Sequence, residues 1–210
     1  AMLPFLPEAF GNPSCLHESG DVPRDALETA RGQVAELINA NPEEIIFTGS
    51  GTESNNTAIK GLAMAQQKKG KHVVVSAIEH FSVLNSAKTL EKWGFEYTSV
   101  PVDKNGVVNP EDVRKAIRDD TILVSVMLAN GEIGTIEPIK QIAKITKEKD
   151  ILFHTDAVAA AGNIPVNVKD LGVDSLSLAA NMFYGPKGIA ALWVKKGTRI
   201  LPLLDGGIQE

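Results

Sequence analysis

Hydrophobic and polar positions follow two different rhythms along the chain, and these rhythms predict its helices and strands. Apolar residues three and four positions apart predict amphipathic helices, whereas short continuous apolar runs predict strands buried on both faces. We expect helices over residues 24–40, 52–69, 80–93 and 138–149, and a short helix after Asn109. We expect strands over residues 45–48, 72–76, 95–100, 121–127, 151–155, 175–178 and 189–194. Residues 1–20 hold several prolines and glycines and are expected to form an irregular loop.

The order of these elements predicts the fold class. Strands and helices that alternate in this way predict an α/β fold in three layers, αβα, with a mostly parallel sheet of about seven strands. In such sheets ligands bind beyond the carboxyl ends of the strands, where the connecting loops gather. We therefore expect a site in the loops at residues 49–52, 79–80, 129–132, 156 and 179–182. Because no linker divides the chain, residues 1–210 are expected to form a single domain.

A glycine-rich turn stands between the first expected strand and the helix that follows it. Gly49, Ser50 and Gly51 make up this turn, and the helix is expected to begin at Thr52. The first backbone N–H groups of a helix lie at its positive end, and together with the nearby hydroxyl groups they suit a phosphate. A tight connection that binds nothing is the alternative, because such turns also occur without a ligand.

Composition narrows the classes of partner. The net charge is −5 and the 21 basic residues are scattered, so no basic surface for nucleic acid is expected. The sequence has no apolar run of about 18 residues, so no membrane span is expected either. The single cysteine, Cys15, cannot form an internal disulfide or a thiolate zinc site by itself. We expect no metal site, a cytoplasmic location, and a small molecule or another protein as partner.

Several loop motifs together resemble one known family. They are IIFTGSGTESNNTAIKG, SAIEH, ANGEIGT, HTDAVAAAGNIPVNV, YGPKG and GGIQE, in this order along the chain. The sequence is similar to the large domain of the cysteine desulfurases, which belong to the class V aminotransferase group of pyridoxal-phosphate enzymes. This resemblance implies an aminotransferase-like large domain over residues 1–210. It also leads us to expect a chain truncated at both ends, without the family's C-terminal small domain.

The resemblance implies roles for four residues. Gly51 and Thr52 would hold the cofactor phosphate, His80 would stack on the pyridine ring, and Asp156 would pair with the ring nitrogen. Each residue also has a local explanation, since Thr52 and Asp156 could cap helices and His80 could pack at a helix start. Their occurrence together, at strand ends and in the family's order, favours a cofactor pocket.

Other positions depart from the family pattern. Met182 stands where the family has the lysine that forms the Schiff base with pyridoxal phosphate, and a thioether cannot replace an amine. Lys187 belongs to the YGPKG turn and is not expected to take over that role. Polar family residues are replaced at Ala179, Ala159 and Gly131. We therefore expect weak, non-covalent binding of pyridoxal 5′-phosphate and no catalytic residue.

Two functions follow from these departures. We favour a non-catalytic scaffold or partner-docking relative in sulfur transfer and iron–sulfur assembly, because the family's catalytic cysteine lies in the small domain and Cys15 matches a serine. The alternative is a pyridoxal-phosphate-dependent cysteine desulfurase, converting L-cysteine to L-alanine and enzyme-bound sulfur, completed by another chain. The resemblance implies a homodimer and an iron–sulfur assembly scaffold protein as partners. An unrelated nucleotide-binding protein would explain the glycine turn but not His80 and Asp156.

Overall fold

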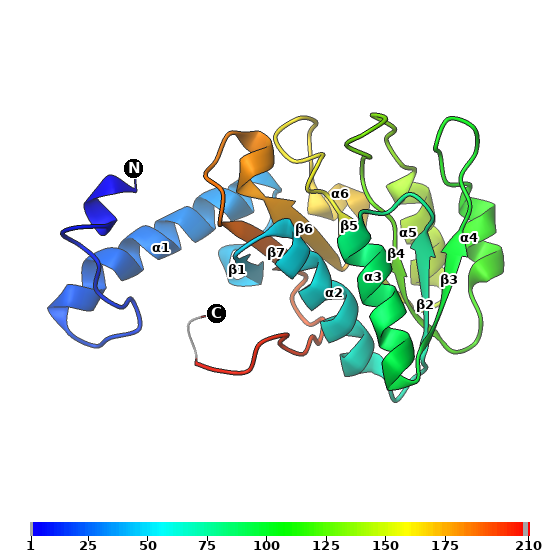
Figure 1. Cartoon of the computed structure of the whole chain (residues 1–210), viewed down its shortest axis with the longest axis horizontal. Coiled ribbons are helices and arrows are strands. Elements are labelled where there is room, and N and C mark those ends of the chain that lie inside the picture. The colour runs from blue at the N-terminus through cyan, green and yellow to red at the C-terminus, as the bar shows by residue number, and fades with distance from the viewer. Residues whose placement is uncertain (1, 208–209) are drawn as a thin grey trace.

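The computed structural model describes residues 2–207 and 210, and its centre is one mixed β-sheet (Figure 1). In these residues the sheet has seven strands in the order β1-β7-β6-β5-β4-β2-β3. The strands are β1 (Ile45–Thr48), β2 (His72–Ser76), β3 (Glu96–Val100), β4 (Thr121–Ser125), β5 (Leu152–Asp156), β6 (Ser175–Ala179) and β7 (Ala190–Val194). Only β7 is antiparallel to its neighbours, β1 and β6. The predicted α/β fold with a mostly parallel sheet is confirmed.

Helices cover both faces of this sheet (Figure 1). Helices α2 (Gly51–Gln66) and α3 (Phe81–Leu90) pack on one face. The other face carries α1 (Glu18–Leu37), α4 (Pro110–Ala116), α5 (Ile139–Glu148) and α6 (Val168–Leu171). Short 3-10 helices are η1 (Leu3–Phe5), η2 (Pro42–Glu44), η3 (Glu91–Trp93) and η4 (Ala180–Phe183). Within the described residues, every helix is too short or too polar to cross a bilayer.

The two helical layers create two apolar cores, one on each side of the sheet. Successive side chains of a strand point to opposite faces. Along β2, Val73 and Val75 pack under α2 and α3, whereas Val74 joins the core on the other face. The strand β7 behaves likewise, with Leu192 in the first core and Trp193 in the second. Strands buried on both faces explain why the sequence shows continuous apolar runs.

The start of the first helix differs from the prediction. We expected an irregular loop up to residue 20 and a helix over residues 24–40, but α1 begins at Glu18 and ends at Leu37. Pro23 lies inside the helix. A proline lacks the N–H donor for one intrahelical hydrogen bond, so the local pattern does not predict a helix that runs through Pro23. The guanidinium of Arg24 donates to the Cys15 carbonyl at 3.2 Å, which connects the helix to the preceding turn.

The N-terminal half of α1 projects away from the sheet, together with the residues before it (Figure 1). We call residues 2–24 the arm. Large apolar side chains are exposed along it, at Leu3, Leu6, Phe10, Leu16 and Val22. Exposed apolar side chains that gather on one segment are typical of a surface that binds another protein.

Candidate functional site

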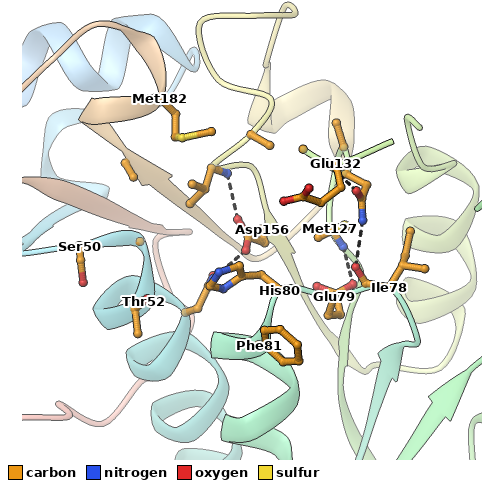
Figure 2. A pocket seen from close by; sticks show the side chains of 18 of the residues that line it. Ser50, Thr52, Ile78, Glu79, His80, Phe81, Met127, Glu132, Asp156 and Met182 are labelled. Carbon is orange, nitrogen blue, oxygen red and sulfur yellow. Dashed lines mark hydrogen bonds between the residues drawn. The ribbon is translucent and has the colours of Figure 1, made fainter. Parts of the chain in front are cut away.

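A cavity of about 560 Å³ opens at the carboxyl edge of the sheet (Figure 2). The amino end of α2 and the loops after β2, β4, β5 and β6 all contribute to its lining. All four residues to which the resemblance gave a role line this single cavity: Gly51, Thr52, His80 and Asp156. Met182 lines it as well. The cavity therefore lies at the edge of the sheet where the order of strands and loops predicts a site.

The amino end of α2 forms one wall of the cavity. Ser50 is the N-cap, and its hydroxyl accepts a hydrogen bond from the Glu53 backbone N–H at 3.1 Å. The N–H groups of Gly51 and Thr52 lie in the first turn of α2, where the helix itself provides no carbonyl acceptor for them. They can therefore bind an anion. A Cβ on Gly51 would lie 2.8 Å from Cγ2 of Val158, so only glycine fits between α2 and the loop after β5.

His80 caps helix α3 and faces the cavity. Its Nδ1 accepts a hydrogen bond from the Ser82 backbone N–H at 3.1 Å and lies 2.7 Å from the Ser82 hydroxyl. Because Nδ1 accepts, we assign the proton of the neutral ring to Nε2. The Asn55 amide donates to the same hydroxyl at 2.9 Å, which leaves the Ser82 proton for Nδ1. His80 thus has both the local role and the position that the sequence indicated.

Asp156 is the buried acid of the cavity, with an exposed fraction of 4%. Its Oδ2 accepts from the Asn55 amide at 2.6 Å, and its Oδ1 accepts from the Val158 backbone N–H at 2.9 Å. Burial raises the pKa of Asp156, while these two hydrogen bonds act in the opposite direction. An N–H group on each oxygen fixes the orientation of the carboxylate toward a donor or a cation. The local alternative, in which Asp156 caps a helix, does not hold, because a turn at residues 158–160 follows the strand.

Glu79 is a second buried acid in the lining, with an exposed fraction of 5%. Its Oε1 accepts from the Ser76 hydroxyl at 2.5 Å and from the Met127 backbone N–H at 2.7 Å. Its Oε2 has no hydrogen-bond partner among the described residues. Burial raises the pKa of Glu79 to about 8, and the charges of Asp156 and Glu137 add to this effect. Most of this carboxyl group is therefore protonated at neutral pH.

The loop after β4 closes the far side of the cavity. The Asn130 amide donates to the Ile78 carbonyl at 3.1 Å, which ties this loop to the loop after β2. Its Oδ1 accepts from the Glu132 backbone N–H at 2.9 Å. Figure 2 shows the exposed carboxylate of Glu132 directed toward the interior of the cavity.

Met182 lies in η4 at the mouth of the cavity, with an exposed fraction of 40% (Figure 2). Lys187 lies in the exposed turn before β7 and is not part of the lining. Among the residues that the structure describes, no lysine or arginine lines this cavity. The lining therefore offers no amine, and His80 is its only basic side chain.

These residues fit one part of pyridoxal 5′-phosphate and not another. Gly51 and Thr52 offer N–H groups for the phosphate, His80 offers a ring to stack on, and Asp156 offers a carboxylate for the pyridine nitrogen. Covalent attachment does not fit, because the Met182 side chain has no nitrogen.

Two residues of the site were missed by sequence reasoning. Asn55, with an exposed fraction of 1%, links His80 and Asp156 through its hydrogen bonds. A polar residue one turn after Gly51, on the helix face that also carries Ile59 and Leu62, was the available signal. Glu79 was placed in the right loop but given no role, since its burial depends on contacts with β4.

Comparisons with known proteins identify relatives of the chain. The family model described as aminotransferase class-V matches residues 1–209. Cysteine desulfurase IscS of Dictyoglomus turgidum is 59% identical over 210 residues, which are 100% of this chain and 53% of that protein. Cysteine desulfurase IscS of Methanosarcina thermophila is 54% identical over 210 residues, covering 100% of this chain and 52% of that protein. The chain thus spans about half the length of these curated relatives.

Solved structures give the same result. The structure titled "SspA in complex with cysteine" has a TM-score of 0.94 and 39% identity, covering 98% of this chain and 60% of that one. The structure titled "NIFS-LIKE PROTEIN" has a TM-score of 0.94 and 40% identity, covering 98% of this chain and 57% of that one. At such identities the likeness extends from the fold to the sequence.

Proposed function

Since the chain belongs to the aminotransferase class-V family, and within it to the cysteine desulfurases, we propose that it is a non-catalytic member. In this proposal the chain is a scaffold that docks a partner protein in sulfur transfer and iron–sulfur assembly. One observation carries the proposal: the cavity that holds His80 and Asp156 has Met182 at its mouth and no lysine among its described lining residues.

The missing amine decides the chemistry. Pyridoxal-phosphate catalysis needs a primary amine that holds the aldehyde and later moves a proton at the substrate. Met182 has neither ability, because its thioether is a weak acceptor without a titratable proton. Lys187 lies outside the lining, in the exposed turn before β7. A rearrangement of the whole turn would be needed to bring its amine into the cavity.

Small residues in the lining also favour weak cofactor binding. The resemblance assigns polar partners of the cofactor to the positions of Ala179, Ala159 and Gly131, which line the cavity. Each lost hydrogen bond costs about 1 kcal/mol, or about 1.5–3 kcal/mol where the ligand group is charged. For one bond to the charged phosphate and two neutral bonds the loss is about 3.5–5 kcal/mol, about half of the roughly 8 kcal/mol that binds a micromolar ligand. Binding at the helix end alone would recover only about 0.3–1 kcal/mol.

The arm supports the docking part of the proposal. Its exposed apolar side chains, such as Leu6 and Phe10, lie on a segment that projects from the sheet. We propose that the arm packs against a second copy of the chain and that the homodimer binds the iron–sulfur assembly scaffold protein. We also propose a cytoplasmic location for the chain.

A second candidate function is a cysteine desulfurase completed by another chain. The presence of Gly51, Thr52, His80 and Asp156 around one cavity favours it, as does the half-length match to the relatives. In that case another polypeptide would supply the amine and the sulfur-accepting cysteine.

Borohydride reduction separates the two functions. The purified chain is mixed with pyridoxal 5′-phosphate, reduced, digested and searched by mass spectrometry for a cofactor adduct. We expect no stoichiometric adduct at any one site, whereas Cysteine desulfurase IscS of Dictyoglomus turgidum, treated in parallel, serves as the positive control. A stoichiometric adduct at a single residue of this chain would refute the non-catalytic proposal.

A second experiment tests docking. Light scattering during size exclusion should report a dimer for the chain, and a monomer for a variant with Leu6→Glu and Phe10→Glu. Pull-down with a purified iron–sulfur assembly scaffold protein should recover the chain and lose it with this variant. A chain that is monomeric and is not recovered with the scaffold protein would contradict the docking role.

A further inference from the structure

We propose that a second cavity, at the amino edge of the sheet, binds a small molecule with two or more phosphate groups. This cavity has a volume of about 530 Å³, within the roughly 300–1,000 Å³ of small-molecule sites. It opens where the parallel strands β4 and β5 begin, whereas the cavity that holds His80 and Asp156 opens where they end. The inference goes beyond the proposed function, because it concerns a different set of residues.

Lysine side chains gather at this cavity from separate parts of the chain. Five of the 21 basic residues line it, although the chain as a whole has a net charge of −5. They come from the segments after α2 and β7, from the end of α5 and from α6: Lys69, Lys195, Lys147, Lys149 and Lys169. Basic residues that are scattered in the sequence thus form one basic site in the fold.

The ion pairs of the lining leave part of this charge free. Lys69 pairs with Asp150 at 3.3 Å, and Lys195 pairs with Asp174 at 3.4 Å. Among residues 2–207 and 210, no carboxylate forms an ion pair with the other three lysines. Asp119 is the third acid of the lining, so five ammonium groups meet three carboxylates and two positive charges remain. An anion with several charges complements this lining.

The negative end of helix α5 gives a local explanation for two of the lysines. Lys147 lies in its last turn and Lys149 is its C-cap, where a cation stabilises the helix. This explanation does not extend to Lys169, the second residue of α6, or to Lys195, which follows β7. A shared anionic ligand explains why all of them meet at one cavity.

The chemistry of the lining favours phosphate over other anions. An ammonium group is a compact charge with three N–H donors, which suits the several oxygens of a phosphate chain. Arginine, which binds a planar carboxylate through two parallel hydrogen bonds, is absent from the described lining. The buried side chains of Ile122 and Ile151 add apolar surface, which suits the base of a nucleotide. A free oligophosphate and a nucleoside triphosphate are therefore the two sources of the phosphate chain.

Calorimetric titration of the whole chain compares these two sources. Inorganic triphosphate and ATP are titrated without divalent cations at about 150 mM salt, where charges more than about 8 Å apart are largely screened. We expect a dissociation constant below about 1 mM for at least one of them, and weaker binding of citrate, whose charges are on carboxylates. Tighter binding of ATP than of triphosphate would identify a nucleotide as the ligand. Equal binding of the two would identify the phosphate chain alone.

A charge-reversed variant and a matched control assign the binding to this cavity. Lys147→Glu with Lys149→Glu should weaken it at least about tenfold, because two ammonium groups of the lining become carboxylates. Lys140→Glu with Lys144→Glu makes the same change of net charge at exposed positions of α5 outside the lining. This control should change the dissociation constant less than about threefold. Lys169→Met, on α6, should weaken binding about threefold or more, so the assignment does not depend on α5 alone. Circular dichroism confirms that each variant folds.

Three results would contradict the inference. The first is that neither phosphate compound binds to the original chain, and the second is that the variant and its control weaken binding equally. The third is that citrate binds as tightly as triphosphate, which would overturn the assignment to phosphate. None of these results affects the non-catalytic proposal, which the borohydride experiment tests separately.

Discussion

The side-chain amide of Asn55 donates to Oδ2 of Asp156 at 2.6 Å, so that helix α2 is joined to the end of strand β5 at the base of the cavity. The same amide donates to the Ser82 hydroxyl at the start of α3. One side chain thus holds three elements that are far apart in the sequence. Without Asn55, the Asp156 carboxylate would remain buried with one oxygen unpaired.

We therefore expect Asn55→Ala to destabilise the chain by about 2–3 kcal/mol, because a buried charged group loses a donor. Urea unfolding followed by circular dichroism measures this loss. Asn56→Ala is the matched control, since the amide of Asn56 bonds to the Thr52 carbonyl at the exposed side of the same helix. The control should cost less than about 0.5 kcal/mol. Equal losses for both variants would show that the link to Asp156 contributes nothing.

The buried carboxyl of Glu79 should make stability fall as the pH rises. Burial raises its pKa from 4.5 to about 8 in the folded chain, so between these values the unfolded chain loses a proton that the folded chain keeps. The contribution of the protonated Glu79 carboxyl to stability is therefore fully present below pH 4.5 and is lost as the pH rises through 8. The charged groups that face Glu79 are Asp156 and Glu137, both acidic.

The variant Glu79→Gln tests this dependence, since a neutral amide can accept the bonds from Ser76 and Met127. Its stability relative to the original chain should increase by an amount of order 4 kcal/mol between pH 5 and pH 8, from the pKa shift. Urea unfolding at pH 5, 6.5 and 8 gives the values. Glu132→Gln, exposed on the same cavity, is the control for a change from glutamate to glutamine and should differ from the original chain by less than about 0.5 kcal/mol at pH 5. If the difference in free energy of unfolding between Glu79→Gln and the original chain is the same at all three pH values, the Glu79 carboxyl is not buried in its protonated form.

His154 gives the opposite pH dependence. It lies on β5 with an exposed fraction of 0%, between the hydroxyls of Ser125 at 2.9 Å and Ser177 at 3.0 Å. Burial lowers its pKa from 6.5 to about 3, so between these pH values the unfolded chain binds a proton at this ring and the folded chain does not. The stability that the neutral ring provides is present above pH 6.5 and is lost as the pH falls toward 3.

We expect the stability advantage of the original chain over His154→Gln to shrink by about 2 kcal/mol between pH 7 and pH 5, which is 1.36 kcal/mol for each unit below 6.5. The exposed His17, changed to glutamine, is the control for the loss of a histidine and should change the stability at pH 7 by less than about 0.5 kcal/mol. An advantage that stays constant from pH 7 to pH 5 would mean that the imidazole is accessible to protons.

The last prediction concerns the missing amine. Met182→Lys alone should not produce alanine and sulfide from L-cysteine, because Ala179, Ala159 and Gly131 still lack the polar contacts of the family. The lone cysteine, Cys15, lies outside the cavity lining. A coupled assay for alanine and a sulfide assay measure the outcome. Turnover by this single variant would refute our account of the cavity.

Much of the architecture follows from the sequence because it depends on local patterns. Continuous apolar runs specify strands buried on both faces, and the strand-turn-helix order places Gly51, His80 and Asp156 at one edge of a parallel sheet. The identity of Met182 excludes an amine at that position in any fold. The predicted start of α1 was wrong, because the helix runs through Pro23. The hydrogen bond from Arg24 to the Cys15 carbonyl, which connects this helix to the preceding turn, is not visible in a local pattern.

By itself, then, the sequence determined the fold class, the edge of the sheet where the site lies, and the absence of an amine at residue 182. Only the tertiary structure decided that Asn55 orients Asp156 and that Glu79 is buried with one oxygen unpaired. The reason is physical: a pKa or a buried hydrogen bond depends on groups that folding brings together. Asn55 and Asp156 are 101 residues apart, and no local pattern contains both.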